Sequence, residues 1–304
     1  MRIVLLSGGV GGARFARGLY GVLEPGDLTV IGNVGDDLEV LGLSISPDLD
    51  SILYTLAGLS DEERGWGRAG ETWNALESSA GWGGEDWFRI GDLDLGLHLV
   101  RTHAMREGAT LTEVTRTLVA RAGVPVELLP ATDDLLRTYV LTPAGTFSFQ
   151  EWFVARGHAD EVDEVEFRGA EAARPAPGVL AAIDGAEAIL IAPSNPFVSI
   201  GPILAVAAIR DAIGRRSVRC VAVSPLIGGK AVKGPADRML SRMAGGTTPA
   251  DVAGCYTGLV DALVVDEADL PADAPVELVA TETLMYDPAA AERLARVVLE
   301  TACA

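Results

Sequence analysis

Residues 3–14 of the chain read Ile3-Val4-Leu5-Leu6-Ser7-Gly8-Gly9-Val10-Gly11-Gly12-Ala13-Arg14. The apolar run is typical of a buried strand, and the residues after the glycines have helical period. Glycines remove side chains, so that backbone N–H groups can approach an anion, and the N-terminus of the next helix carries a partial positive charge. The stretch therefore predicts a strand, a phosphate-binding turn and a helix, with Arg14 as an added cation. The alternative is a tight turn in which the glycines serve only close packing.

The glycine motif matches neither of two common phosphate-binding patterns. No Gly-Lys-Ser/Thr follows it, which excludes a Walker loop, and Arg14 stands where the dinucleotide fingerprint needs its third glycine. By itself the motif indicates a phosphate or nucleotide of unspecified kind.

Composition indicates a globular protein with a substantial core. Of its 304 residues, 49% are hydrophobic. No run of 18 apolar residues occurs and no signal-like segment begins the chain, so we expect a cytoplasmic protein with no membrane contact. The net charge of −19 argues against a nucleic-acid partner. The three cysteines are widely spaced, which fits neither a disulfide framework nor a thiolate zinc site.

Further apolar runs alternate with segments of helical period. The runs lie at residues 28–31, 188–192, 219–223 and 262–265, and the helical segments at 12–23, 111–122, 201–213, 249–259 and 288–301. Strands that are apolar along their whole length and alternate with helices predict an α/β fold, a Rossmann-like parallel sheet covered by helices.

The middle of the chain has a different pattern. Residues 135–153 alternate around Pro143-Ala144-Gly145, which predicts two antiparallel strands, and a Pro/Ala-rich stretch follows at 173–178. We therefore expect a nucleotide-binding core made of residues 1–124 and 185–304, with a small inserted α+β subdomain at residues 125–184.

Polar or glycine-rich residues follow most of the predicted strands. In open parallel sheets, ligands bind outside the carboxyl ends of the strands. Besides the glycine motif, the segments are 32–37, 192–196, 224–229 and 266–267. Five loops are expected to converge on one edge. The only two lysines, Lys230 and Lys233, lie just after one of them, which chance or a local need for a compact cation would explain.

Four aspartates fall within about fifteen residues of one another: Asp36, Asp37, Asp48 and Asp50. Carboxylates in such numbers suit Mg²⁺, which takes one or two of them together with substrate phosphates. Capping and turn formation are the alternative for each. Either Asp48 or Asp50 is expected to cap a helix that begins at Ser51. The other of the two would then be free to face the site.

A second acidic element spans residues 89–98 and contains Arg89 and His98. His98 is a candidate for orienting a phosphate or for proton transfer, or else a structural hydrogen-bonder. Four tryptophans precede or enter this element and either stack on a flat ligand ring or fill a helical sub-core. They are Trp66, Trp73, Trp82 and Trp87. No serine or cysteine nucleophile can be assembled with a histidine, which favours phosphoryl-type transfer over covalent catalysis.

Seven motifs in order make the chain resemble the 2-phospho-L-lactate transferases of deazaflavin coenzyme (factor 420) biosynthesis. They are Ser7-Gly8-Gly9-Val10-Gly11-Gly12-Ala13-Arg14, Asn33-Val34-Gly35-Asp36-Asp37, Ser46-Pro47-Asp48-Leu49-Asp50, Leu129-Pro130-Ala131-Thr132-Asp133-Asp134, Phe149-Gln150-Glu151-Trp152, Ala192-Pro193-Ser194-Asn195-Pro196 and Ser224-Pro225-Leu226-Ile227-Gly228-Gly229. The form of the glycine motif and the Arg- and Ala-rich composition resemble the actinobacterial branch, in which the transferred group is phosphoenolpyruvyl.

The resemblance implies a Mg²⁺-dependent enzyme. It would move a phosphoenolpyruvyl or 2-phospho-L-lactyl group from a guanosine diphosphate-linked donor to 7,8-didemethyl-8-hydroxy-5-deazariboflavin and release GMP. A homodimer is implied as well. Asp50 and Arg89 match the positions that contact the deazariboflavin. The donor would be held by Gly9, Gly11, Gly12, Arg14, Asn33, Ser194, Asn195, Gly228 and Gly229, with Lys230 as a further cation.

The carboxylate argument leaves the division of roles open. All four aspartates are metal candidates, and Asp36, Asp48 and Asp50 are the catalytic candidates, one of which would take the proton of the acceptor hydroxyl. One departure from the family is Leu93, which replaces an arginine often found before the histidine. The alternative function is that of a non-catalytic nucleotide-sugar-binding regulatory protein, as in the related carbon-metabolism and cell-shape family that shares the glycine motif.

Overall fold

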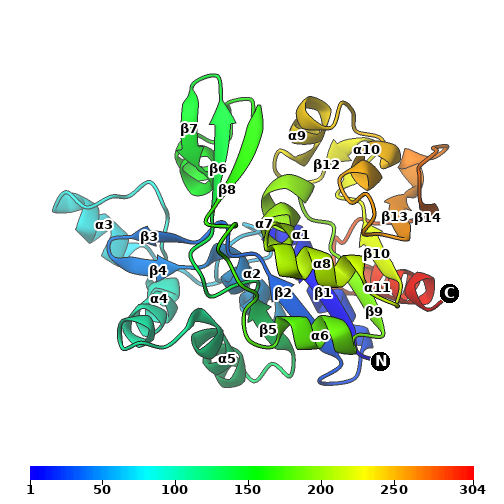
Figure 1. Ribbon diagram of the computed structural model, residues 1–304. Helices are drawn as coiled ribbons and strands as arrows, with labels where there is room; N and C mark the ends of the chain where they lie inside the picture. The colour runs from blue at the N-terminus through cyan, green and yellow to red at the C-terminus, as the bar shows by residue number, and fades with distance from the viewer.

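A parallel sheet of seven strands forms the centre of the protein in a computed structural model, which describes residues 1–304 (Figure 1). The strand order is β14-β13-β10-β9-β1-β2-β5, and every neighbouring pair is parallel. The inner strands are buried along almost their whole length. The strands are β1 (Ile3–Ser7), β2 (Leu28–Gly32), β5 (Glu127–Pro130), β9 (Ala188–Ile191), β10 (Cys220–Val223), β13 (Ala262–Asp266) and β14 (Glu277–Thr281). The predicted α/β fold is confirmed.

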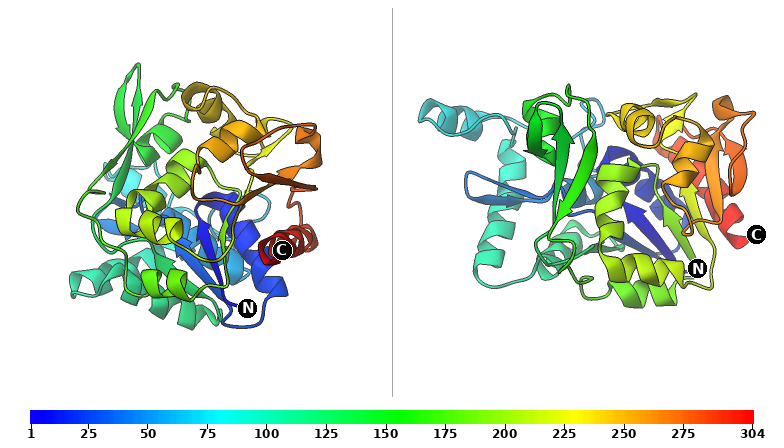
Figure 2. Two further views of the ribbon diagram at one scale, coloured as in Figure 1. Left: turned by 45° about the vertical axis from the view of Figure 1, so that its right-hand side comes forward. Right: turned by 45° about the horizontal axis from the view of Figure 1, so that its top comes forward.

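Helices cover both faces of the sheet, as expected when strands are added on both sides of β1 through right-handed crossovers. One face carries α1 (Gly9–Val22), α2 (Pro47–Leu56), α5 (Leu111–Ala122) and α11 (Pro288–Cys303). The other carries α6 (Val179–Gly185), α7 (Gly201–Ala205), α8 (Ala207–Gly214) and α10 (Pro249–Gly254). The two turned views show the sheet between these layers (Figure 2).

The helices differ from the predicted ones mainly at their ends. The first begins at Gly9 rather than at residue 12, so the glycines form its first turn. The segment 201–213 is not one helix, because Val206 is extended between α7 and α8. The segment 249–259 is helical only as far as Gly254. Neither Asp48 nor Asp50 caps a helix at Ser51, because α2 already begins at Pro47.

A three-stranded antiparallel sheet stands apart from the main sheet, at the top of Figure 1. Its strands are β6 (Arg137–Thr142), β7 (Gly145–Ser148) and β8 (Glu164–Arg168), and the predicted turn joins the first two. Residues Glu151–Ala155 form a π-helical turn, η1, where the second strand was expected to continue. The antiparallel unit is narrower than residues 125–184, because β5 pairs with β2 in the main sheet and α6 packs against α8.

The remaining elements are an arm with one helix, two short hairpins, and several helices and helical turns. We call residues 57–91 the arm; it contains α3 (Asn74–Gly81) and extends to the left of Figure 1. The others are β3 (Leu38–Val40), β4 (Leu43–Ile45), α4 (Asp92–Arg106), η2 (Pro196–Ile200), β11 (Leu226–Ile227), β12 (Lys230–Ala231), α9 (Ala236–Met243) and η3 (Glu267–Asp269).

The chain contains no single helix of the length and apolar character that crossing a membrane requires. One bent pair, Pro196–Ala205 with Ala207–Gly214, meets the criteria of length and composition only when its two parts are taken together.

Candidate functional site

A pocket of about 560 Å³ lies where the carboxyl ends of the strands meet. Its floor comes from the first turn of α1 and from the residues that follow β2, β9 and β10. Its walls come from the arm and α4, from the antiparallel unit, and from the segments before α9 and after β14. The predicted convergence of strand ends is confirmed for four of the five loops, and the segment after β13 is not part of the lining.

The glycines at the start of α1 are needed for close packing as well as for access. A Cβ atom at Gly8 would lie 2.6 Å from Oδ2 of Asp48, and one at Gly11 would lie 2.8 Å from the carbonyl oxygen of Pro193. Gly12 lies behind the lining, where a Cβ would meet the hydroxyls of the neighbouring serines. Gly9 has a φ of +69° and lines the pocket, and a Cβ atom there would lie 3.6 Å from Oγ of Ser199, an ordinary contact. The N–H groups of this first turn have no helical partners, and those beyond the Gly9 N–H, which bonds Asp48, are the candidates for binding an anion.

Asp36 and Asp48 form a buried pair of like charge beside this turn, and both line the pocket. Nδ2 of Asn33 donates to Oδ2 of Asp48 at 2.9 Å, while Oδ1 of Asp36 has no hydrogen-bond partner. Burial raises the pKa of Asp48 to about 6, against the lowering effects of Asn33 and the Gly9 N–H. Burial and the charge of Asp48 raise the pKa of Asp36 well above its usual range. A divalent cation would stabilise this pair, because it relieves the repulsion between the carboxylates.

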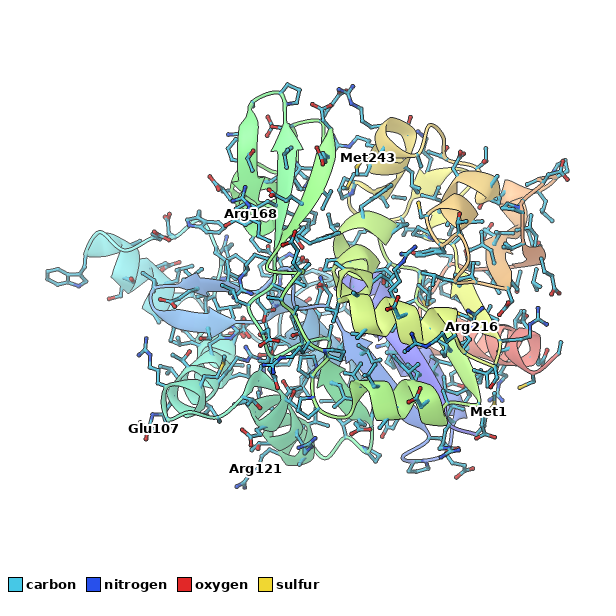
Figure 3. The ribbon with its side chains drawn as sticks, in the orientation of Figure 1. Met1, Glu107, Arg121, Arg168, Arg216 and Met243 are labelled. Atoms are coloured by element: carbon cyan, nitrogen blue, oxygen red, sulfur yellow. The ribbon has the colours of Figure 1, made fainter.

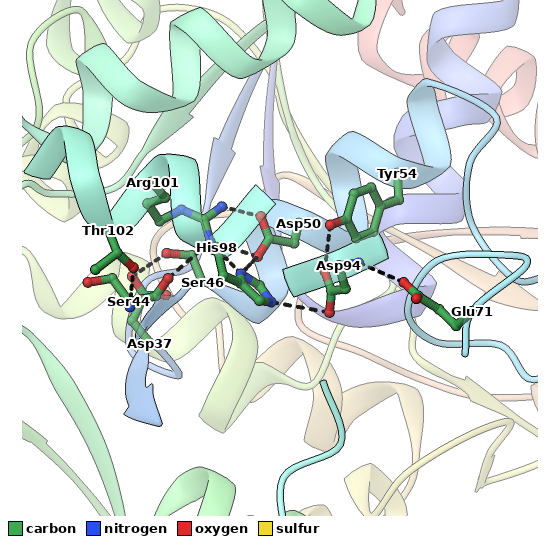
Figure 4. Close-up of polar contacts among 10 residues, drawn as sticks. All are labelled: Asp37, Ser44, Ser46, Asp50, Tyr54, Glu71, Asp94, His98, Arg101 and Thr102. Atoms are coloured by element: carbon green, nitrogen blue, oxygen red, sulfur yellow. Dashed lines mark hydrogen bonds and ion pairs between the residues drawn. The ribbon is translucent and has the colours of Figure 1, made fainter. Parts of the chain in front are cut away.

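Asp50 points away from that pair, because two residues along a helix are about 200° apart. Its carboxylate forms a two-pronged ion pair with Arg101 of α4, in which Oδ2 accepts from Nη1 at 2.9 Å and Oδ1 accepts from Nη2 (Figure 4). The Arg101 side chain is 1% exposed, whereas Asp50 lines the pocket. The guanidinium therefore fixes the orientation of a carboxylate that faces the ligand space.

Asp37 lies on the Asp50 side and outside the pocket lining. The hydroxyl of Ser46 donates to Oδ2 of Asp37 at 2.9 Å (Figure 4). No group of three or more His, Cys, Asp or Glu side chains is placed so that it would hold a metal ion. The four aspartates thus do not form the single cluster that their spacing suggested, and Asp36 and Asp48 are the pair that faces the pocket together.

The pKa of Asp37 gives a prediction for the pH dependence of stability. Burial raises this pKa to about 7, although Arg137 and the Ser46 hydroxyl lower it. A carboxyl group with a raised pKa in the folded state stabilises the fold below its unfolded pKa of about 4, and this contribution is lost as the pH rises through 7. We expect the free energy of unfolding to fall more steeply between pH 5 and pH 8 in the wild type than in Asp37→Asn. Equal slopes in chemical denaturation would contradict the prediction.

His98 lies between two carboxylates and is 1% exposed. Its Nε2 is 3.2 Å from Oδ2 of Asp94, its Nδ1 is 3.8 Å from Oδ2 of Asp50, and the Tyr54 hydroxyl donates to Oδ1 of Asp94 at 2.5 Å (Figure 4). Burial opposes ionisation of Asp94, but His98 and Tyr54 lower the pKa of that carboxyl overall. With its Nδ1 also 3.3 Å from Nη1 of Arg101, the histidine belongs to a buried polar network around Asp50 and Asp94, and it lines the pocket as well.

Three of the other predicted donor ligands line the pocket: Arg14, Ser194 and Asn195. The Ser194 hydroxyl donates to the carbonyl oxygen of Gly8 at 2.7 Å, which ties the loop after β9 to the first turn of α1. Oδ1 of Asn195 accepts from the Phe197 N–H at 2.9 Å and begins η2. Both side chains therefore shape the floor of the pocket.

The other predicted donor ligands lie outside the pocket lining. Asn33 lies outside the lining, and its two amide atoms are bonded to Asp48, to the Val198 carbonyl and to the Gly35 N–H. Gly228 and Gly229, with φ of +57° and +70°, form the tight turn between β11 and β12. Lys230 has 82% of its side chain exposed and lies 4.0 Å from Asp237. These residues follow strand ends in the sequence, but none of them lines the pocket.

The tryptophans belong mainly to a surface arrangement on the arm. The Arg64 guanidinium lies 4.7 Å from the ring centroid of Trp66 and 5.1 Å from that of Trp73, and Arg89 lies 4.6 Å from the latter. Trp82 is 91% exposed. The four rings do not form a sub-core over the sheet, and Trp66 is the one that lines the pocket, together with Arg89.

Two features of the lining were not predicted from the sequence. One is a stack of rings in which Phe149 lies 5.2 Å from Phe153, and Phe153 lies 4.9 Å from His158. These rings join the antiparallel unit to α9 through a buried cluster, and the two units face each other in Figure 3, where Arg168 and Met243 mark them. In the sequence, only the i, i+4 spacing of the two phenylalanines could have indicated that their rings lie together. The other feature is which of the two lysines singled out in the sequence lines the pocket, because Lys233 does so and Lys230 does not.

The fold and pocket define a Rossmann-like protein with a composite ligand site at the carboxyl edge of its sheet. The chain belongs to the family described as 2-phospho-L-lactate transferase CofD, whose model matches residues 3–302. It is therefore a transferase.

Curated relatives and solved structures agree with this placement. A phosphoenolpyruvate transferase of Streptomyces griseus is 44% identical over 313 residues, covering 99% of this chain and 98% of the relative. One of Kitasatospora aureofaciens is 45% identical over 314 residues, with the same coverage. The crystal structure of protein BH3568 from Bacillus halodurans has a TM-score of 0.64 at 18% identity and covers 98% of this chain and 99% of that one. This last likeness shows the fold.

Proposed function

We propose that the chain transfers a phosphoenolpyruvyl group from a guanosine diphosphate-linked donor to 7,8-didemethyl-8-hydroxy-5-deazariboflavin and releases GMP, in deazaflavin coenzyme biosynthesis. The names of the relatives support phosphoenolpyruvyl over 2-phospho-L-lactyl as the transferred group. The observation that carries the proposal is one pocket in which a buried aspartate pair and the N-terminus of a helix adjoin a carboxylate held by an arginine.

Mg²⁺ fits the pair formed by Asp36 and Asp48. Both carboxylates face the pocket, each has a raised pKa, and one oxygen of Asp36 is buried without a partner. When bound, the ion would neutralise charge on the donor phosphates, as hard cations do in phosphoryl transfer.

The residues of the chain supply positioning and proton transfer. The N–H groups of the first turn of α1 bind phosphate oxygens, and Asp50 accepts the hydrogen bond of the acceptor hydroxyl. The hydroxyl oxygen attacks the phosphorus that carries the transferred group, the bond from that phosphorus to the GMP oxygen breaks, and Asp50 takes the hydroxyl proton. Arg89 and the ring stack of Phe149, Phe153 and His158 offer contacts to flat ring systems.

The test is a reaction of the purified protein with Mg²⁺, the deazariboflavin and each guanylylated donor in turn. We expect release of GMP and a product whose mass equals that of the acceptor plus the transferred phospho-group, with the phosphoenolpyruvyl donor preferred. Absence of GMP with both donors would overturn the proposal. Quenching of deazariboflavin fluorescence on binding would exclude the regulatory nucleotide-sugar binder. The family resemblance also favours a homodimer located in the cytoplasm. Size-exclusion chromatography tests the oligomeric state.

A further inference from the structure

Lys233 is a pocket cation without an acidic partner. Its ammonium donates to the carbonyl oxygens of Gly65 at 3.2 Å and Arg64 at 3.4 Å, and it makes no ion pair. Lys230, the other lysine, points to solvent near Asp237. In a chain with 43 acidic residues and 24 basic ones, an ammonium held only by neutral carbonyls keeps its charge available to an anionic ligand.

Arg14 is a second cation on the same lining. Its closest carboxylate is that of Glu62, at 3.8 Å from Nη2. Burial lowers the pKa of Lys233, and the charge of Arg14 lowers it further, so the two cations are near enough to repel each other. An anion bound beside both would remove this repulsion.

The arm provides the place in which the Lys233 ammonium rests. Gly65 has a φ of +73°, and a Cβ atom there would overlap Nζ of Lys233. Gly67, two residues further on, has a φ of +68°, but a Cβ there would meet no atom within 4 Å. The contact therefore depends on the absence of a side chain at position 65, and Gly67 is a control with the same backbone conformation.

We propose that Lys233 and Arg14 bind the phosphate groups of the donor, and that the carbonyls of Arg64 and Gly65 hold the ammonium of Lys233 until the donor arrives. This inference rests on the proposed function, because that function identifies the donor as a guanosine diphosphate-linked compound. The ammonium exchanges its carbonyl partners for phosphate oxygens without breaking an ion pair. Lys233 and Arg14 together thus provide the positive charge that a Walker loop carries in its own lysine. The glycine motif lacks such a lysine.

Competitive labelling of the two lysines tests the inference without turnover. The wild-type protein is treated with a limiting amount of an amine-acylating reagent, with and without saturating GDP and Mg²⁺ or inorganic pyrophosphate, and acylation is read by peptide mass spectrometry. We expect both ligands to slow acylation of Lys233 about fivefold or more, as masking by a charge-assisted hydrogen bond implies. Lys230 serves as the internal reference and should be unaffected.

Variants provide the second measurement. We expect Lys233→Gln to weaken GDP binding about tenfold or more in calorimetry, the loss typical of a hydrogen bond to a charged group. Lys230→Gln should bind like the wild type. Gly65→Ala should speed acylation of Lys233 in the ligand-free protein relative to Gly67→Ala, because only the former displaces the ammonium from its carbonyl partners.

The outcomes separate this inference from the proposed function. If GDP binds but leaves acylation of Lys233 unchanged, and Lys233→Gln binds it as tightly as the wild type, the inference is overturned while the proposed function stands. If neither GDP nor pyrophosphate binds the wild type, both are overturned.

Discussion

Replacing Arg101 with methionine is expected to lower the free energy of unfolding by about 3–5 kcal/mol, the usual cost of leaving one partner of a buried ion pair alone. Both oxygens of Asp50 accept from this guanidinium, whose side chain is 1% exposed. His98 contacts Asp50 only at 3.8 Å and would not replace the lost charge. Chemical denaturation monitored by circular dichroism gives the measurement.

Two further variants show whether the lost charge or the lost packing is responsible. Arg106→Met removes an exposed arginine of the same helix that donates to the Gly42 carbonyl, and it should change stability little. Asp50→Asn combined with Arg101→Met should be more stable than Arg101→Met alone, because no buried charge is left without a partner. If Arg101→Met were as stable as the Arg106 control, the ion pair would not hold this part of the fold.

Arg101 and His98 show what the sequence revealed about the site and what it left out. Both lie on α4, and the i, i+4 spacing of Asp94 and His98 was visible in the sequence. The partner of Arg101, however, is 51 residues away on α2. Helical period places residues on one face of a helix, but it does not tell which helix packs against that face.

The aspartates illustrate the effect of a misplaced helix start. With a helix beginning at Ser51, Asp48 and Asp50 would share a loop with freedom to converge on one ion. With the observed start at Pro47, the two side chains leave the helix in different directions, one toward Asn33 and one toward Arg101. An error of four residues in this helix boundary therefore changes the interpretation. The four carboxylates expected around one ion form two groups, Asp36 with Asp48 and Asp37 on the side of Asp50.

The lysines, at the other side of the pocket, also show that a sequence pattern does not specify where a side chain points. Their position after a strand end correctly drew attention to the segment, and the parallel sheet brought that segment to the site. Gly228 and Gly229 then turn the chain back on itself, so that Lys230 faces solvent and Lys233 reaches the arm. The difference depends on a two-residue turn, whose effect on side-chain direction the sequence pattern did not specify.

Asp48→Asn is expected to reduce the rate of transfer by about 100-fold to 1,000-fold, the range found when one stabilising polar group is removed from a transition state. It should at the same time raise the free energy of unfolding at pH 8 by about 1 kcal/mol, as the removal of functional strain commonly does. The reason is that Asp48 and Asp36 are buried together with raised pKa values, so that their charges destabilise the fold unless a cation is bound. An amide at position 48 retains a hydrogen bond from Asn33 and keeps the shape of the side chain.

Asp37→Asn is the matched control for this prediction. Asp37 also has a raised pKa, but it lies outside the pocket lining, so its amide variant should gain stability at pH 8 and retain most of the activity. Thermal unfolding with and without Mg²⁺ adds a readout that needs no substrate: the ion should stabilise the wild type and Asp37→Asn, but not Asp48→Asn. If Asp48→Asn were active and stabilised by Mg²⁺ like the wild type, the pair formed by Asp36 and Asp48 would not be the metal site. A gain in stability together with a loss of rate would mean that the fold tolerates this repulsion because the reaction uses it.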